Sequence, residues 1–415
     1  MVNTEHNTDA ERQHLAERKQ RHWLMSAIAL SYFALGLGVA LTTVYLTDIE
    51  RCPLAAVAAA LTCSGALSIF AAQFSGRIAD RWGAAPVLAT LLAAQCLGRA
   101  LLVATDCRSV MYVAVICTNS LVPAAVGMRS AITAQLGGVH RRARLAASGR
   151  AAANLCYAVG AAAAGAVLAA GSADAYRLTL TACAGLTGLA CATAILIPRR
   201  LSTATSNETP RAHTRPALTD LRFLGITASA GGLLMFYDDI LALAFPLLII
   251  RAKHTPMWIC SVALLINALG VGVGQVAATR RVHSLRRAAH VEVAAATLMA
   301  LACAELPWAM RSGTAAAIAA LLTAAFFLTA AEILQSAGAI ILSFDLAPPD
   351  RHGDYQGVFS SGYAALSCLT PSVLGLIVTH PSTGWYVLAA TLILTGAAVP
   401  ALAGAADRRR ALADG

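Results

Sequence analysis

Long apolar runs separated by short polar connections recur along nearly the whole chain. Each run is about 20 residues long, enough for a helix to cross a hydrocarbon core roughly 30 Å thick. Because unpaired backbone groups are costly in lipid, we expect these runs to be helices rather than open strands. The pattern predicts twelve spans, at about 23–46, 54–75, 85–105, 109–137, 148–170, 176–197, 221–250, 256–278, 288–308, 313–343, 356–378 and 384–404.

Two polar segments organise these spans. Residues 1–22 lack the apolar stretch and cleavage site of a signal peptide, and are interpreted as a tail. The longest internal polar segment separates the sixth span from the seventh. The predicted organisation is therefore a tail at 1–22, a six-helix bundle at 23–198, a linker at 199–220, a second six-helix bundle at 221–404 and a tail at 405–415.

Composition excludes a large soluble protein. Of the 415 residues, 58% are hydrophobic and 13% are charged, and the mean hydropathy is +0.66. Soluble helices of this length would need charged faces, which these runs lack. The predicted fold class is an all-α polytopic membrane protein.

Basic residues predict the orientation. They gather in alternate connections, starting with the N-terminal tail, so the positive-inside rule places both termini in the cytoplasm. The formal net charge of +10 is thus interpreted as a topology signal rather than as a sign of nucleic-acid binding. The preference for Ala, Gly and Arg over Lys is typical of a GC-rich bacterial genome, so we expect a bacterial inner membrane.

A charged motif interrupts the apolar pattern between the second and third spans. A cytoplasmic loop that follows the positive-inside rule would explain Arg77 and Arg81 of this motif. The same rule does not explain the acidic Asp80. The pattern Gly76-x-x-x-Asp80-Arg81-x-Gly83 resembles the cytoplasmic signature of the major facilitator superfamily, the twelve-helix secondary transporters. The resemblance implies a conformational latch in which Asp80 lies near the N-terminus of the eleventh helix, beside Arg351.

A weak internal repeat agrees with this family. Residues 134–146 align with residues 344–356, so that Leu136 falls on Leu346 and Arg141 falls on Arg351. Each stretch follows the fourth span of its half. Two related six-helix halves are the architecture of many secondary transporters.

The sequence offers no source of chemical energy and no cofactor site. Neither Lys19 nor Lys253 lies in the Gly-x-x-x-x-Gly-Lys pattern of a nucleotide-driven pump. The 11 cysteines and 10 histidines form no metal-ligand pattern. Transport driven by an ion gradient therefore remains, with protons and a small molecule as the expected partners.

Acidic residues inside the spans are the candidates for proton coupling, because a charge in the membrane is costly and often functional. Asp238 and Asp239 lie in the seventh span, and Glu332 lies in the tenth. A carboxyl group held away from water takes up a proton more readily. Alternatively, these acids pair with buried arginines. Arg129, late in the fourth span, is one such counter-charge, unless it extends to the membrane face.

The family resemblance also suggests where substrate binds. It implies that the first, fourth, seventh and tenth helices line a central cavity, which makes Tyr32 and Asn119 candidate contacts. Met235 lies on one predicted helical stripe of the seventh span, and Gln335 lies near the acid of the tenth. The residues of the stripe are Ala228, Gly231, Met235, Asp238 and Ala242. Met235 and Gln335 are therefore further candidates.

The direction of transport depends on a second resemblance. Residues 346–364, with Tyr355, Gln356 and Gly357, resemble a connection found in bacterial drug and metabolite exporters. The linker lacks the sugar-porter signature, and the fifth span lacks the Gly-Pro pair of the antiporter signature. We expect a monomeric, proton-coupled exporter (an antiporter) of a small amphipathic compound such as a drug, antibiotic or secondary metabolite. An importer or uniporter of a small metabolite, a polytopic membrane enzyme and a non-transporting sensor are the alternatives.

Overall fold

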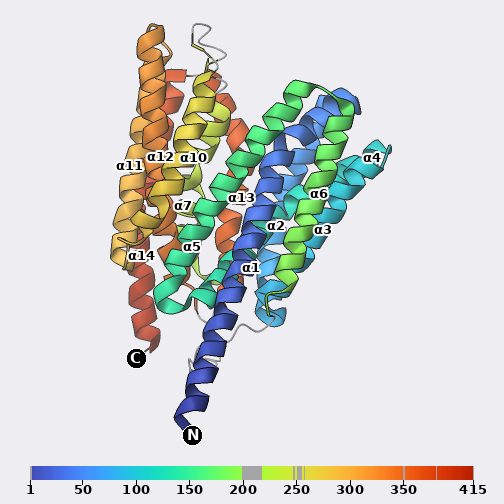
Figure 1. Ribbon diagram of the computed structural model, residues 1–415. Helices are drawn as coiled ribbons and strands as arrows, with labels where there is room; N and C mark the ends of the chain where they lie inside the picture. Colours follow the sequence, from blue (N-terminus) through green and yellow to red (C-terminus); the bar gives the residue numbers. More distant parts are fainter. Residues whose placement is uncertain are drawn as a thin grey trace.

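The computed structural model describes residues 2–198, 217–245, 248–249, 255–256, 258–348, 351–379 and 381–414 (Figure 1). Within these residues every regular element is a helix, which confirms the predicted all-α class. Most of the predicted linker, residues 199–216, lies outside the described residues.

The N-terminal half makes six crossings. The fourth, Arg108–Leu136, is interrupted at Leu121, and the fifth is Arg142–Leu168. The elements of this half are α1 (Val2–Val44), the π-helical η1 (Tyr45–Ile49), α2 (Leu54–Trp82), α3 (Ala84–Ala104), α4 (Arg108–Ser120), α5 (Val122–Ala170) and α6 (Ala173–Ile195).

In the described part of the C-terminal half, four helices are long and apolar enough to span a membrane, and α13 and a broken seventh segment accompany them. The elements are η2 (Ala217–Thr219), α7 (Leu221–Ser229), η3 (Leu233–Met235), α8 (Tyr237–Asp239), η4 (Ile240–Ala244), α10 (Trp258–Thr279), α11 (Leu285–Ala309), α12 (Thr314–Asp345), α13 (His352–Thr379) and α14 (Pro381–Asp414).

The seventh crossing is not the continuous helix that the sequence predicted over 221–250. The α-helix stops at Ser229, and the chain continues through short 3-10, α and π turns. Gly232 has non-helical dihedral angles, and a Cβ at Gly231 would lie 2.9 Å from the carbonyl oxygen of Phe359 on α13. Two adjacent glycines therefore allow close backbone packing at the cost of helix continuity. The stripe predicted from Ala228 to Ala242 is consequently not one helical face.

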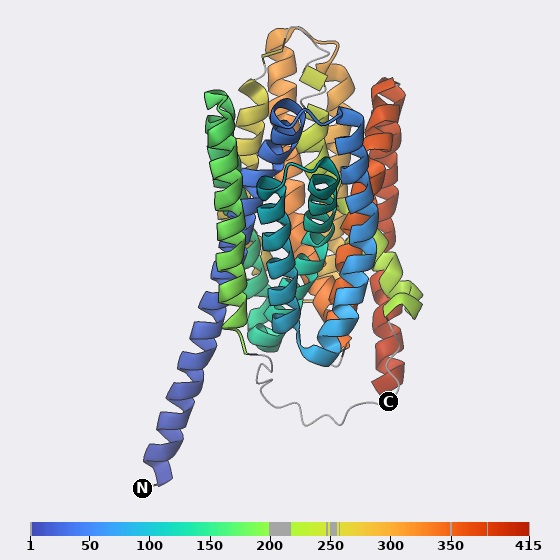
Figure 2. The same cartoon turned by 90° about the vertical axis from the view of Figure 1, so that its right-hand side faces the viewer.

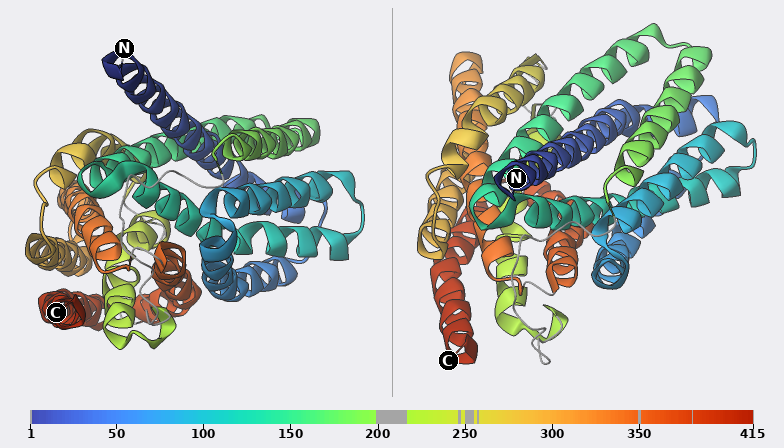
Figure 3. Two further views of the ribbon diagram at one scale, coloured as in Figure 1. Left: turned by 90° about the horizontal axis from the view of Figure 1, so that it is seen from below. Right: turned by 60° about the horizontal axis from the view of Figure 1, so that its bottom comes forward.

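The two halves meet along a few long helices. Helix α2 packs on α13, and α5 packs on both α10 and α13. Both termini lie at the same end of the molecule, called the terminal end below, together with the turn between α2 and α3 (Figures 1 and 2). The helices of the two halves are inclined so that the halves approach each other at this end and diverge toward the other (Figures 1 and 3).

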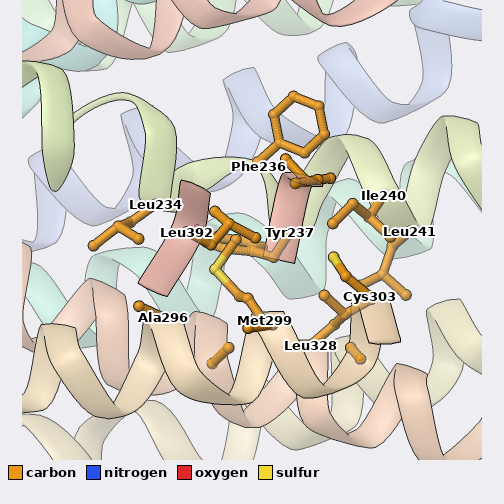
Figure 4. Packing of buried hydrophobic residues seen from close by; sticks show 14 of the residues in the cluster. Leu234, Phe236, Tyr237, Ile240, Leu241, Ala296, Met299, Cys303, Leu328 and Leu392 are labelled. Carbon is orange, nitrogen blue, oxygen red and sulfur yellow. The ribbon is translucent and has the colours of Figure 1, made fainter. Parts of the chain in front are cut away.

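Apolar packing fixes the broken seventh segment in the C-terminal half. Phe236 and Tyr237 are fully buried, and they belong to a cluster with Met299 and Cys303 of α11 and Leu328 of α12 (Figure 4). Burial of these large side chains holds an irregular backbone in one conformation. The neighbouring acids of this segment are thereby held in fixed directions.

Candidate functional site

A buried carboxylate joins the two halves of the molecule. Glu332 of α12 is 3% exposed. Its Oε1 accepts a hydrogen bond of 2.7 Å from the side-chain amide of Asn154 on α5, and its Oε2 accepts one of 2.7 Å from Asn267 on α10. Arg150 of α5 lies 3.3 Å from the same Oε1. One acid of the C-terminal half is therefore neutralised and held by two side chains of the N-terminal half.

Arg150 also reaches the broken segment. Its Nη2 donates a hydrogen bond of 2.6 Å to the Tyr237 hydroxyl group. Because Tyr237 is buried in the C-terminal core, the guanidinium is held at a defined position between the halves. A charge-assisted hydrogen bond of this kind is stronger than a neutral one.

The two adjacent acids of the seventh segment face different neighbours. Asp238 is exposed and accepts a hydrogen bond of 3.2 Å from the Tyr363 hydroxyl group on α13. It lies close enough to Glu332 and Arg150 to interact with both electrostatically, so its exposure is toward the region between the halves. Asp239 is partly buried and accepts a hydrogen bond of 2.8 Å from Thr370 on α13.

Arg129 lies inside the N-terminal half. It is 8% exposed, and its Nη2 donates a hydrogen bond of 2.7 Å to the Ser31 hydroxyl group on α1. Its guanidinium lies 5.3 Å from the centre of the Tyr32 ring. The burial is inconsistent with the alternative that Arg129 extends to the membrane face.

The other predicted cavity residues lie around this network rather than in it. Gln335 is buried, and its amide donates to the carbonyl oxygen of Ala230 at 2.6 Å, where the seventh helix breaks. Met235 packs against the C-terminal core. Asn119 donates to the carbonyl oxygen of Val115 at the junction between α4 and α5. These contacts support local structure.

Asp80 contacts the N-terminus of α13, as the sequence motif suggested. Its two carboxylate oxygens accept hydrogen bonds from the backbone N–H groups of Gly353 at 2.8 Å and Asp354 at 2.9 Å. The first turn of a helix exposes unpaired N–H groups and a partial positive charge, which favour an anion. Its role as a conformational latch remains a prediction.

Two glycines permit this approach. A Cβ at Gly76 would lie 3.2 Å from the Gly353 carbonyl carbon, so α2 and α13 touch backbone to backbone. Gly83 has φ of 91° at the turn into α3, a conformation that L side chains rarely adopt. Gly76 therefore allows the close contact between α2 and α13, and Gly83 allows the chain to reverse direction between α2 and α3.

The arginine that contacts the other half is Arg77 rather than Arg81. Arg77 lies 3.7 Å from the buried carboxylate of Asp354, and Arg351 lies 4.0 Å from it. Arg81 is exposed at the end of α2. The family resemblance implied a place for Arg81 in the latch; among the described residues it forms no ion pair, and its role remains a prediction.

Three further contacts lie at this end, and one of them crosses between the halves. The Asp354 carboxylate accepts a hydrogen bond of 2.8 Å from the backbone N–H of Ala217, the first described residue near the end of the linker. Tyr355 donates to Asp220, which also caps α7. Arg142 of α5 pairs with Asp345 of α12 across the halves. Several independent contacts thus hold the halves together at the terminal end.

Sequence reasoning did not single out Arg150, Asn154, Asn267 or Tyr237. Arg150 lies at the start of the predicted fifth span, close to a cluster of arginines, so it was not distinguished from a topology marker. The two asparagines are uncharged residues inside apolar spans, and only their polarity could have marked them. Their common partner is evident only after the helices pack.

A profile described as Major Facilitator Superfamily matches residues 23–371. The chain belongs to the Major Facilitator Superfamily. No curated protein sequence matches it.

Solved structures agree with membership of the superfamily. A bacterial homologue of the iron transporter ferroportin, in an outward-facing state, aligns with a TM-score of 0.72 at 14% identity, covering 93% of this chain and 99% of that chain. The human organic anion transporter MFSD10 aligns with a TM-score of 0.62 at 15% identity, with the same coverage. The E. coli fucose:proton symporter aligns with a TM-score of 0.59 at 13% identity, covering 93% of this chain and 98% of that chain. At these identities the likeness establishes the fold of a multi-pass membrane transporter, and not its substrate.

Proposed function

We propose that this superfamily member exports a small amphipathic organic compound, such as a drug, antibiotic or secondary metabolite, in exchange for protons. It would act as a monomer in a bacterial inner membrane with both termini in the cytoplasm. The observation that carries the proposal is the position of Glu332, a buried carboxylate that binds Arg150 and Asn154 of the opposite half.

Protonation of Glu332 would couple proton movement to rocking of the halves. The ionised carboxylate attracts Arg150 and accepts from both asparagines, so it favours the arrangement in which the halves touch here. A proton removes the negative charge and weakens the ion pair. The protonated protein would rearrange more easily, and the carboxyl group would lose its proton after the site opens to the other side.

The terminal end would act as the inner gate. Contacts of Asp80 with α13 and of Arg142 with Asp345 exist while this end is closed. Their loss and recovery would accompany each transport cycle. Rocking of two halves around a central site is how many transporters of this architecture alternate access.

The test begins with substrates chosen by drug susceptibility of an expressing strain against a deletion strain. In inside-out vesicles, an acidic lumen should drive accumulation of such a compound by an antiporter. Accumulation that instead requires external acid, with the compound and the proton moving together, would indicate an importer.

Single variants then identify the proton carrier. Glu332→Gln should insert normally and lose pH-driven accumulation, while counterflow exchange of substrate survives because it needs no net protonation. Asp238→Asn and Asp239→Asn are compared in the same assay, since both acids were candidates from sequence. Normal pH-driven transport in all three variants would remove these residues from the coupling mechanism.

A further inference from the structure

Charged groups deep in the crossings are divided between the halves. Among the described residues, the N-terminal half contributes Arg99, Arg129 and Arg150, whereas the C-terminal half contributes Asp238, Asp239, Glu292 and Glu332. Direct pairing across the boundary joins Arg150 to Glu332. The boundary region therefore carries more acid than base.

Most of these groups already have partners that occupy them. Arg150 is shared by Glu332 and Tyr237, and Arg129 is enclosed by Ser31 and Tyr32. Such groups are poorly placed to bind a solute without breaking existing contacts.

Asp238 differs from them. It is exposed toward the region between the halves, and the hydrogen bond that it accepts comes from the neutral hydroxyl group of Tyr363. In the part of the chain that the structure describes, no cationic side chain lies within ion-pair distance of it. Its carboxylate can therefore still accept strong hydrogen bonds from a cation.

Aromatic side chains surround this carboxylate. Besides Tyr363, the exposed Tyr157 of α5 and the buried Tyr237 both interact with Asp238 electrostatically. Aromatic rings attract cations through their faces, and a carboxylate adds a charge-assisted hydrogen bond. An ammonium group on an apolar or aromatic body fits both features.

We propose that Asp238 is the counter-ion of the transported compound and that this compound carries a protonated amine. The inference rests on the proposed function and names its substrate class. A carboxylate substrate would meet a like charge, and a neutral one would leave the Asp238 carboxylate without an ion-pair partner. A coordinated metal ion is less suitable, since the described residues contain no group of three His, Cys, Asp or Glu that could hold one.

Three classes of compound that differ only in their terminal group test the proposal. We would add 4-phenylbutylamine, 4-phenylbutanol and 4-phenylbutyrate, with their naphthyl and anthracenyl counterparts, to the purified full-length protein in lipid nanodiscs. The readout is the midpoint of thermal unfolding, because a ligand that binds only the folded state raises it. We expect the amines to raise the midpoint in a concentration-dependent way, and the alcohols and carboxylates to leave it unchanged.

Variants assign the effect to the residue. Asp238→Asn should raise the half-saturating amine concentration at least about tenfold, the loss expected for a charged hydrogen bond. Asp238→Glu should recover part of the binding. Glu305→Gln removes another carboxyl group of the C-terminal half and should bind amines normally. Each variant is compared with its own midpoint without ligand, so altered folding does not obscure the result.

Three outcomes would overturn the proposal: no amine stabilises the protein, the alcohols stabilise it equally, or Asp238→Asn leaves amine binding intact. Any of them, combined with acid-driven accumulation of a neutral or anionic compound in vesicles, would reject Asp238 as the counter-ion of an amine substrate and leave proton-coupled export standing. Amine binding without any acid-driven accumulation would instead reject the proposed export and retain the site.

Discussion

Arg150 of α5 and Glu332 of α12 lie 3.3 Å apart across the boundary between the two halves. They are far apart in the sequence, and each also bonds to a polar side chain of the opposite half. Because the pair lies at the boundary, its energy depends on how the halves are arranged. The Arg150–Glu332 pair is therefore suited to coupling proton movement to rearrangement of the halves. Its contribution to stability can be measured directly.

Removing only one member of this pair should cost stability. Arg150→Gln leaves an uncompensated carboxylate in a buried site, which costs several kcal/mol when both partners are fully buried. Because Arg150 is 31% exposed, solvent screening reduces the expected loss to about 1–2 kcal/mol. The double variant Arg150→Gln with Glu332→Gln should recover part of it, with a coupling energy of about 0.5–2 kcal/mol.

Denaturant unfolding in matched micelles measures this double-mutant cycle. The control is Arg177→Gln, which breaks the more exposed Arg177–Glu50 pair and should change stability by less than about 0.5 kcal/mol. Strictly additive single effects would mean that Arg150 and Glu332 do not stabilise each other.

Asp80→Asn should weaken the contact with α13. The amide cannot replace the charge that interacts with the helix N-terminus, and a loss of about 1.4 kcal/mol would shift the conformational equilibrium roughly tenfold. We expect strongly reduced turnover and greater accessibility at the terminal end, while substrate affinity changes little. Cysteine-accessibility labelling on both faces measures the shift.

The matched control is Arg81→Gln, since Arg81 belongs to the same motif but is exposed at the end of α2. It should keep near wild-type accessibility and turnover. If Asp80→Asn behaves in the same way, the charges of the motif mark topology only, and the latch interpretation is wrong.

Gly76→Ala tests the same contact sterically. Its new methyl group would lie within 3.3 Å of backbone atoms of Gly353 and Asp354, so α2 and α13 must separate. We expect slower transport and greater accessibility at the terminal end, as for Asp80→Asn. Gly165→Ala is the control, because a Cβ at Gly165 meets nothing within 4 Å. Equal effects of the two substitutions would show that the close approach at Gly76 has no special importance.

The sequence by itself determined the membrane architecture. Hydrophobicity along a run is a local property, and a run of sufficient length must become a helix in lipid. The apolar spans and their division into two sets followed from such patterns. The contact of Asp80 with the eleventh helix was implied by the resemblance of residues 76–83 to a family signature.

Tertiary structure alone decided the central site. The break of the seventh helix depends on backbone contact between Gly231 and α13, which a periodicity analysis over 221–250 cannot register. Arg150, Asn154 and Asn267 meet at Glu332 because three helices distant in sequence present particular faces to one another. Rotating a helix about its axis leaves the hydrophobicity of the span unchanged. The same rotation changes which side chains each buried residue contacts. The physical reason is that side-chain pairing depends on helix rotation and register, which packing between the halves selects.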